Sequence, residues 1–252
     1  MPALPSLLTR VLLVAAALGP CLAAAAAPLP SPALTPLPAV PASLAVPAVP
    51  TSLAVPAVPA SAPVLPPLAV GDLVFIRVPW RPFVEVAAAT GSWTNHVGIV
   101  VDTGGPEPLV AESTFPLARA TPLSRFVARS EGARVAVRRL AQPLDEAQAA
   151  RLKAAAQARY GALYDTGFDL RSPWRQFCSR FVHEVLLQAT GATVGEVERF
   201  ETLLRRRPDA NLGFWRLWYF GRIPWQRQTV TPASVLASPL LRPVFDGRWQ
   251  RS

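Results

Sequence analysis

Residues 177–190 read FCSRFVHEVLLQAT. Counted from Cys178, apolar side chains recur 3, 4, 7, 8 and 11 residues further on. This spacing is typical of an amphipathic helix whose apolar face covers a core. We therefore expect a helix that begins near Phe177, with Cys178 at its N-terminal end on the face turned toward the rest of the domain.

The position of Cys178 bears on its chemistry. The unpaired N–H groups and the dipole at a helix N-terminus stabilise an anion and so lower the pKa of a thiol. The chain has one other cysteine, Cys21, which lies in a leader-like segment. A lone cysteine is either an inert buried residue or a reactive nucleophile, and the sequence leaves both open.

Upstream of this helix, the pattern changes to that of strands. Apolar, β-branched stretches predict strands at residues 73–78, 97–102, 109–113 and 134–140. Gly104-Gly105-Pro106 predicts a hairpin turn between the second and third of them. Residues 143–161 predict a further helix, with acidic side chains in its first turn and Gly161 at its end. We expect the fold class to be α+β, with a small antiparallel sheet or an incomplete barrel packed against the Cys178 helix.

A cysteine nucleophile needs a base, and the chain contains two histidines. His183 follows Cys178 by five residues on the same helix, which turns it about 140° away. We therefore expect a structural role for His183. His96 opens the strand at 97–102, where it could face the start of the helix. Glu112 lies across the predicted hairpin and could orient the imidazole, although it could also point outward to solvent.

An ordered set of short motifs resembles the YiiX-type branch of the NlpC superfamily. In chain order the motifs are GDLVF at 71–75, NHVGIV at 95–100, AES at 111–113, YGALYD at 160–165, FCS at 177–179 and TPAS at 231–234. That branch comprises circularly permuted papain-like cysteine hydrolases, related in fold to the lecithin:retinol acyltransferase group. The resemblance covers about residues 69–240 and implies a circularly permuted papain-like, NlpC-like fold.

The resemblance also implies roles for single residues. Cys178 matches the nucleophile, His96 the base and Glu112 the orienting residue, and Tyr164 of the tyrosine-aspartate motif would line the substrate pocket. As in the permuted branch, the histidine precedes the cysteine in the chain. Arg180 stands in the short stretch after the cysteine where an acidic residue is common, which puts the substrate preference in doubt. We expect no cofactor and no metal, because the sequence has no cluster of His, Cys and acidic ligands.

The N-terminal part of the chain differs in composition from the rest. Arg10 is the only charged residue among residues 1–70. Residues 1–27 combine this charge, an apolar run and a tract of small residues, the layout of a secretory signal peptide. A membrane anchor is the competing interpretation, but Gly19-Pro20 interrupts the run. A lipid-modified Cys21 is a further alternative.

Proline and alanine dominate residues 28–68, in which the octapeptide SLAVPAVP occurs twice. Such a stretch favours polyproline II and predicts a semi-rigid spacer, unless it is a low-complexity tract without a role. Residues 69–252 then form the hydrolase domain. We expect the protein to be exported, to the periplasm or beyond the cell, and to be a monomer.

The net charge of +9 would suit a polyanionic partner. Nearly all of this charge is arginine, however, which a genome-wide codon bias also produces, and export removes most nucleic acid from reach. We expect no nucleic-acid partner. Three classes of function stay open: a hydrolase of amide or peptide bonds in the cell envelope, such as those of wall peptides; a lipid-directed acyltransferase or thioesterase; and a binding module without turnover.

Aromatic and arginine residues alternate in residues 212–225, LGFWRLWYFGRIPW. Aromatic rings interleaved with guanidinium groups suit a membrane interface. The segment is therefore predicted to contact lipid at the membrane surface or to cover an apolar pocket. The alternative is that its rings pack into the domain's own core.

Overall fold

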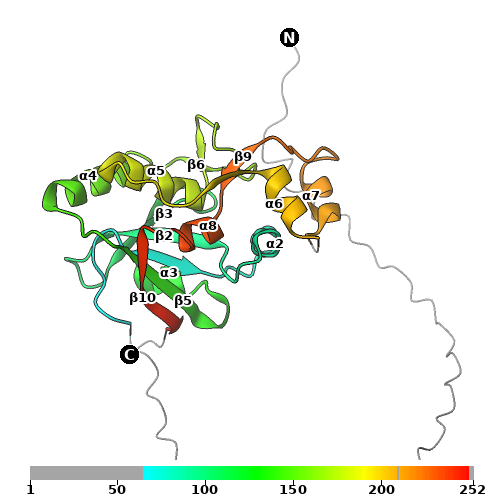
Figure 1. Ribbon diagram of the computed structural model, residues 1–252. Coiled ribbons are helices and arrows are strands. Elements are labelled where there is room, and N and C mark those ends of the chain that lie inside the picture. Colours follow the sequence, from blue (N-terminus) through cyan, green and yellow to red (C-terminus); the bar gives the residue numbers. More distant parts are fainter. Residues whose placement is uncertain (1–64, 209, 250–252) are drawn as a thin grey trace, which may run out of the picture. The chain divides into compact units, whose positions relative to one another are not determined.

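The computed structural model describes residues 65–208 and 210–249 (Figure 1). The predicted signal peptide, residues 1–27, lies outside the described residues, as does the spacer apart from residues 65–68. Both stay predictions. Leu65 and Leu68 pack against apolar side chains of the domain.

A six-stranded antiparallel sheet forms the centre of the domain, in the order β10-β5-β1-β2-β3-β4. Its strands are β1 (Leu73–Ile76), β2 (His96–Asp102), β3 (Leu109–Glu112), β4 (Arg119–Pro122), β5 (Arg134–Leu140) and β10 (Leu241–Arg248). The four predicted strands are therefore confirmed to within two residues. β4 and β10, which form the two edges of the sheet, were not predicted.

Each face of the sheet has its own hydrophobic core. Along β1, Leu73 and Phe75 belong to the larger core, and Val74 and Ile76 to the smaller one, because neighbouring side chains in a strand point to opposite faces. The helices α4 (Glu146–Gln157) and α5 (Cys178–Thr190) contribute to the larger core and lie on one side of the sheet in Figure 1. The short helix α3 (Leu123–Val127) contributes to the smaller one.

The predicted Cys178 helix is α5, and it begins at Cys178 itself. Its buried apolar residues are Cys178, Phe181, Val182, Val185, Leu186 and Ala189, the face that the spacing predicts. The helix ends before Gly191, whose φ of 77° is left-handed and suits glycine. The antiparallel sheet packed against the cysteine-bearing helix is thereby confirmed.

The other predicted helix, α4, is shorter than expected. Asp145 forms a capping box with Gln148 at its start, which satisfies two backbone N–H groups of the first turn. The prediction that Gly161 ends this helix was wrong. The helix stops at Gln157 with Ala158 as its C-cap, and Gly161 lies further on in a turn, where its φ is 82°.

The remaining elements are mostly short. They are α2 (Arg81–Thr90), the 3-10 turn η1 (Glu131–Ala133), β6 (Leu163–Tyr164), β7 (Arg175–Gln176), β8 (Val197–Arg199), α6 (Phe200–Arg206), α7 (Leu212–Trp218), β9 (Gln228–Val230) and α8 (Pro232–Leu236). β6 pairs with β7 in parallel, and β8 pairs with β9 antiparallel.

The aromatic segment at 212–225 is divided between the interior and the surface. Trp215 is buried in the larger core, and Trp218 and Tyr219 donate hydrogen bonds to the carbonyl oxygens of Thr166 and Gly167. Leu217 and Phe220 remain exposed. The alternative that the rings of this segment pack into the domain's own core therefore holds for part of the segment, and the exposed residues are left outside it.

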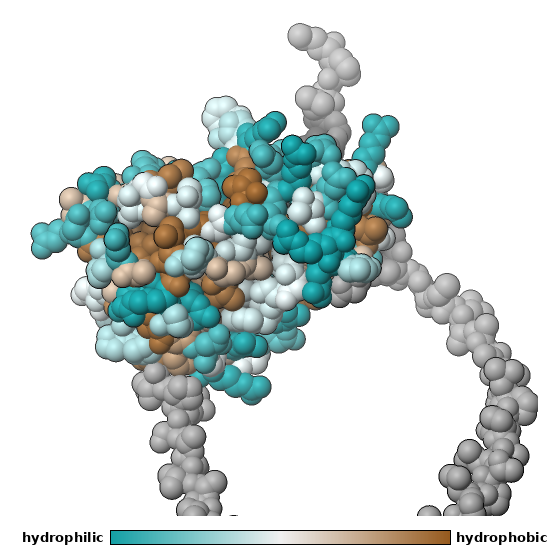
Figure 2. All heavy atoms as spheres, in the orientation of Figure 1, coloured by the Kyte–Doolittle hydropathy of each residue, from teal (hydrophilic) through white to brown (hydrophobic). Residues whose placement is uncertain are grey.

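On the face drawn in Figure 2, hydrophobic residues reach the surface in separate patches between hydrophilic ones. Within residues 65–208 and 210–249, no helix is both long enough and apolar enough to span a bilayer.

Candidate active site

The pairing of β2 with β3 brings His96 and Glu112 together. His96 Nε2 lies 2.6 Å from Glu112 Oε2, and both side chains are buried. Glu112 therefore points into the domain, not outward to solvent. With Nε2 donating to the carboxylate, His96 Nδ1 is the nitrogen left over, and this buried atom has no hydrogen-bond partner among the described residues.

Two further side chains hold the Glu112 carboxylate. Arg129 Nη2 donates to its oxygens at 2.8 and 2.7 Å, and Thr121 Oγ1 donates to Oε1 at 2.7 Å. Burial raises the pKa of Glu112, but the hydrogen bond and charge of His96 and those of Arg129 outweigh it and lower the pKa from 4.5 to about 2. The carboxylate is therefore ionised at neutral pH.

The sequence pattern singles out neither Arg129 nor Thr121. Thr121 lies in β4, opposite Val110 of β3, so its hydroxyl meets Glu112 through the register of an edge strand. Arg129 follows α3 and stacks over Phe126 at 5.0 Å from the ring centroid. No short motif marks either residue, because both act through tertiary contacts.

Cys178 lies at the start of α5, where its thiol is buried against the beginning of β2. Its Sγ atom is 4.0 Å from the carbonyl oxygen of Asn95. Burial raises the pKa of the thiol, but the His96 imidazole and the N–H groups of Val97 and Ser179 outweigh this and lower it below 9.0.

Cys178 and Glu112 in turn shift the pKa of the His96 imidazole. Burial lowers the pKa of His96, but Cys178 and Glu112 outweigh it and raise the pKa above 6.5. The two shifts have opposite signs, so they favour a thiolate beside an imidazolium over two neutral groups.

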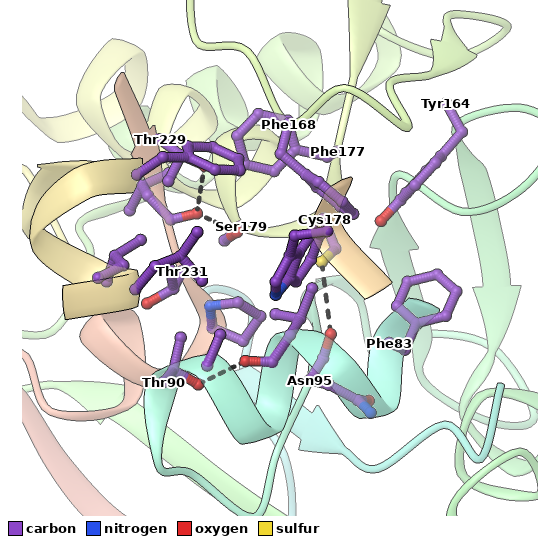
Figure 3. Close-up of a pocket in the computed structure, with 18 residues that line it drawn as sticks. Phe83, Thr90, Asn95, Tyr164, Phe168, Phe177, Cys178, Ser179, Thr229 and Thr231 are labelled. Carbon is purple, nitrogen blue, oxygen red and sulfur yellow. Dashed lines mark hydrogen bonds between the residues drawn. The ribbon is translucent and has the colours of Figure 1, made fainter. Parts of the chain in front are cut away.

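Tyr164, in β6, shares a cavity with Cys178. In Figure 3 its hydroxyl end points toward Cys178, and Phe83 lies on the same side of the thiol. The hydroxyl is buried and has no hydrogen-bond partner among the described residues. Burial, together with the negative charge of Cys178, raises the pKa of Tyr164 well above 10.0, so the hydroxyl remains a donor.

The cavity beside Cys178 is narrow, with about 40 Å³ of free space. Apolar side chains from α2, α6 and α7 form much of its wall: Phe83, Val86, Ala89, Phe200, Leu203, Leu204 and Trp215. Trp215 thus places the segment at 212–225 against an apolar pocket, one of the two roles predicted for that segment.

His183 lies away from this site. Its Nδ1 atom is 2.8 Å from the carbonyl oxygen of Val194, which ties α5 to the loop that follows it. The structure therefore brings together Cys178, His96, Glu112 and Tyr164, and leaves His183 in a structural position.

The thiol of Cys178 stands at a helix start beside an imidazole that is bound to a carboxylate. The imidazole lies on a strand that precedes the helix in the chain. This arrangement is typical of the class of permuted papain-like cysteine hydrolases. The sequence profile of the family described as permuted papain-like amidase enzyme, YaeF/YiiX, C92 family, matches residues 67–245. The chain belongs to this family.

Individual relatives agree with this assignment. The chain is 29% identical to the protein YiiX of Escherichia coli (strain K12) over 174 residues, which cover 69% of this chain and 84% of that protein. It is also similar to the crystal structure of YiiX from Escherichia coli O157:H7, with a TM-score of 0.63 and 27% identity over 72% of this chain and 98% of that one.

The YiiX crystal structure is described as that of a metalloprotein. In this chain, residues 65–208 and 210–249 contain no group of three or more His, Cys, Asp or Glu side chains that could hold a metal ion.

Proposed function

We propose that this protein is an exported cysteine hydrolase that cleaves an amide or peptide bond in the cell envelope. One observation carries the proposal: the buried Glu112 carboxylate holds His96 Nε2, Nδ1 has no hydrogen-bond partner among the described residues, and the imidazole lowers the pKa of the Cys178 thiol. This is the arrangement that nucleophilic catalysis by a thiolate requires.

In the proposed reaction, the Cys178 thiolate attacks the carbonyl carbon of the amide, and an S–C bond forms while the carbonyl π electrons move onto oxygen. As the intermediate collapses, the C–N bond breaks and the leaving nitrogen takes the proton from His96. His96 then removes a proton from water, which attacks the thioester. The C–S bond breaks, the acid leaves, and the thiolate is restored.

Two kinds of donor are available to the oxyanion that forms in this reaction. One is the backbone N–H at the start of α5, and the other is the Tyr164 hydroxyl, which points toward Cys178 in Figure 3. Fixed donors at the place where negative charge develops are a large source of rate enhancement. Tyr164 would therefore act as a donor as well as a wall of the substrate pocket.

Support for an envelope location comes from the sequence of residues 1–27, which has the layout of a secretory signal peptide. Amide and peptide bonds of wall peptides are the corresponding candidate substrates.

The apolar wall of the cavity favours a second candidate, a lipid-directed acyltransferase or thioesterase that uses the same thiol. A narrow cavity lined by Phe, Leu and Val side chains suits a small apolar group, such as the part of an acyl chain next to its carbonyl. In that case the carbonyl attacked by Cys178 would belong to a fatty acyl ester or thioester.

The experiment compares two electrophiles, one peptidyl and one fatty acyl, by mass spectrometry of labelled Cys178 in the full chain. We expect the peptidyl reagent to react faster with the wild type. His96→Ala should slow that labelling at pH 7 by about tenfold or more, because the pKa of the buried thiol then rises.

His183→Ala is the matched control and should label like the wild type. Preference for the fatty acyl reagent would select the second candidate. An unreactive Cys178, or equal losses in the two histidine variants, would contradict both and leave a binding module without turnover.

A further inference from the structure

Large apolar side chains are exposed together at the edge of the candidate active site, and we call them the rim patch. The rim patch consists of Trp80, Phe115, Leu117, Leu163 and Trp174. The rings of Trp80 and Phe115 are 6.0 Å apart, and Leu117 pairs with Leu163 in a β-bridge. Trp174 directly precedes Arg175, the residue of β7 that pairs with Leu163 of β6. These contacts join Trp80 to Phe115 and Leu117 to Leu163, and the pairing of β6 with β7 brings the backbone of Trp174 next to Leu163.

The rim patch borders the cavity that contains Cys178. Trp80 stacks on Phe83 with the ring centroids 6.3 Å apart, and Leu163 directly precedes Tyr164 in β6. Phe83 and Tyr164 both line the cavity (Figure 3). A partner that covers the rim patch would therefore lie next to the reacting thiol.

The degree of exposure is unusual for side chains of this size. Trp174 is 81% exposed and Trp80 is 57% exposed. Contiguous apolar surface on a soluble domain is a mark of an interaction site. Tryptophan in particular suits the headgroup level of a bilayer, where its ring meets lipid and its N–H meets water.

Positive charge accompanies these rings. Arg119 is close to Leu117 in the chain, and Arg171 and Arg175 flank Trp174. In the part of the chain that the structure describes, none of these three guanidinium groups has a hydrogen-bond or ion-pair partner.

The acidic side chains of the same neighbourhood are already engaged. Asp165 accepts hydrogen bonds from the backbone of Gly167 and Asp169, and Asp169 lies 3.4 Å from Arg227. Asp165 is buried and Asp169 is paired with Arg227, so the three arginines leave unpaired positive charge beside the rim patch. This charge complements an anionic phospholipid surface.

We propose that the rim patch docks this protein on an anionic phospholipid bilayer, with Trp80 and Trp174 at headgroup level and the three arginines against lipid phosphates. This goes beyond the proposed hydrolase activity, because docking requires no turnover. Its consequence is that the Cys178 cavity is held beside the bilayer surface.

The test measures co-sedimentation of the full chain with vesicles. We expect binding to mixed phosphatidylcholine and phosphatidylglycerol vesicles, weaker binding to phosphatidylcholine alone, and a loss of the difference at high salt. Replacing both tryptophans (W80S/W174S) should lower the affinity by about tenfold or more, since two interfacial rings are removed. R171Q/R175Q should weaken the binding that depends on phosphatidylglycerol.

The matched control is L217S/F220S, which removes exposed apolar side chains from the region of α7. All variants carry the same residues 1–64, so any contribution of that segment is common to them. We expect the control to bind within about twofold of the wild type. Circular dichroism and thermal unfolding of each variant check that it is folded.

Four outcomes would overturn the proposal: no binding by the wild type; no loss in the folded W80S/W174S variant; loss in L217S/F220S alone, which would transfer the contact to α7; or a wild-type dimer that W80S/W174S dissociates while vesicle binding persists. The last would make the rim patch an interface between copies of this chain. None of these readouts depends on hydrolysis, so failure of the proposed function leaves the test intact.

Discussion

Glu112 has more polar contacts than any other side chain named in the candidate site. It receives hydrogen bonds from His96, Thr121 and Arg129 while fully buried. A buried carboxylate is tolerated only when it is paired, and these contacts supply the pairing. Glu112 therefore links the orientation of the imidazole to the stability of the sheet.

Replacing Glu112 with Gln should make stability less dependent on pH. The pKa of Glu112 in the folded protein, about 2, lies below its ordinary 4.5, so its ionisation stabilises the fold above pH 4.5 and the effect is lost as pH falls through 2. The shift corresponds to about 3 kcal/mol. Denaturant unfolding should show wild type and E112Q furthest apart at pH 7 and converging below pH 4.

The matched control for this series is Glu146→Gln, an exposed residue at the start of α4. The difference in the free energy of unfolding between E146Q and the wild type should stay constant over the same pH range. A constant difference between wild type and E112Q from pH 7 to pH 3 would contradict the assignment of the stabilisation to the ionised carboxylate.

At the scale of elements, β2 and β3 approach each other closely at Gly98. A Cβ atom at this position would lie 2.5 Å from Val110 Cγ1 and 2.9 Å from Phe126 Cε2. Both contacts are shorter than real Cβ atoms allow, so a side chain would push β2 away from β3 or from α3. Since β2 carries His96 and β3 carries Glu112, the fit of these elements fixes the geometry of the site.

Gly98→Ala should therefore destabilise the protein by about 1 to 3 kcal/mol, the usual range for overpacking, and should slow the labelling of Cys178 in the same preparation. Urea unfolding measures the first effect. Gly104→Ala is the control, because a Cβ there would meet its nearest neighbour at 3.5 Å. If G98A is as stable as G104A, the contact does not constrain the strands.

The extent to which sequence predicts these elements follows from their burial. β1, β2, β3 and β5 each contain a short buried apolar run because both faces of the sheet are covered, and α5 repeats its apolar residues at helical spacing. The edge strand β10 has an exposed pattern and contains Pro243 and Gly247, so no periodicity marks it. β4 and the short helices α6 to α8 escape prediction for the same reason.

In the candidate site, too, the sequence predicts some residues and not others. Cys178, His96, Glu112 and Tyr164 stand in short motifs, and the structure places them around one cavity or one hydrogen-bond network. Arg129 and the rim patch, apart from Leu163, stand in no motif. Their positions depend on loops and edge strands that meet only in the folded domain.

At the scale of the whole molecule, the domain begins before the apolar run of β1. Leu65 and Leu68 pack against the smaller core, and the carbonyl oxygen of Pro67 accepts a hydrogen bond from Arg139 at 3.3 Å. The last residues of the predicted spacer therefore contribute contacts to the domain.

A chain that starts at Ala69 should be less stable than one that starts at Leu65, by about 1 to 3 kcal/mol for the lost apolar contacts. Urea unfolding of both chains measures the difference, and gel filtration should show both as monomers. The full chain is the reference and should unfold like the chain from Leu65. Equal midpoints for the two shortened chains would contradict a role for residues 65–68.

The pairing of β10 with β5 has a consequence for biosynthesis. The ribosome releases β1 to β5 first, then α5 with its thiol, and last the strand that covers the open edge of β5. Domains of this size generally fold as units. Under the proposed mechanism, a translation product that ends before α5 carries His96 and Glu112 but lacks Cys178, so it cannot form the proposed acyl-enzyme.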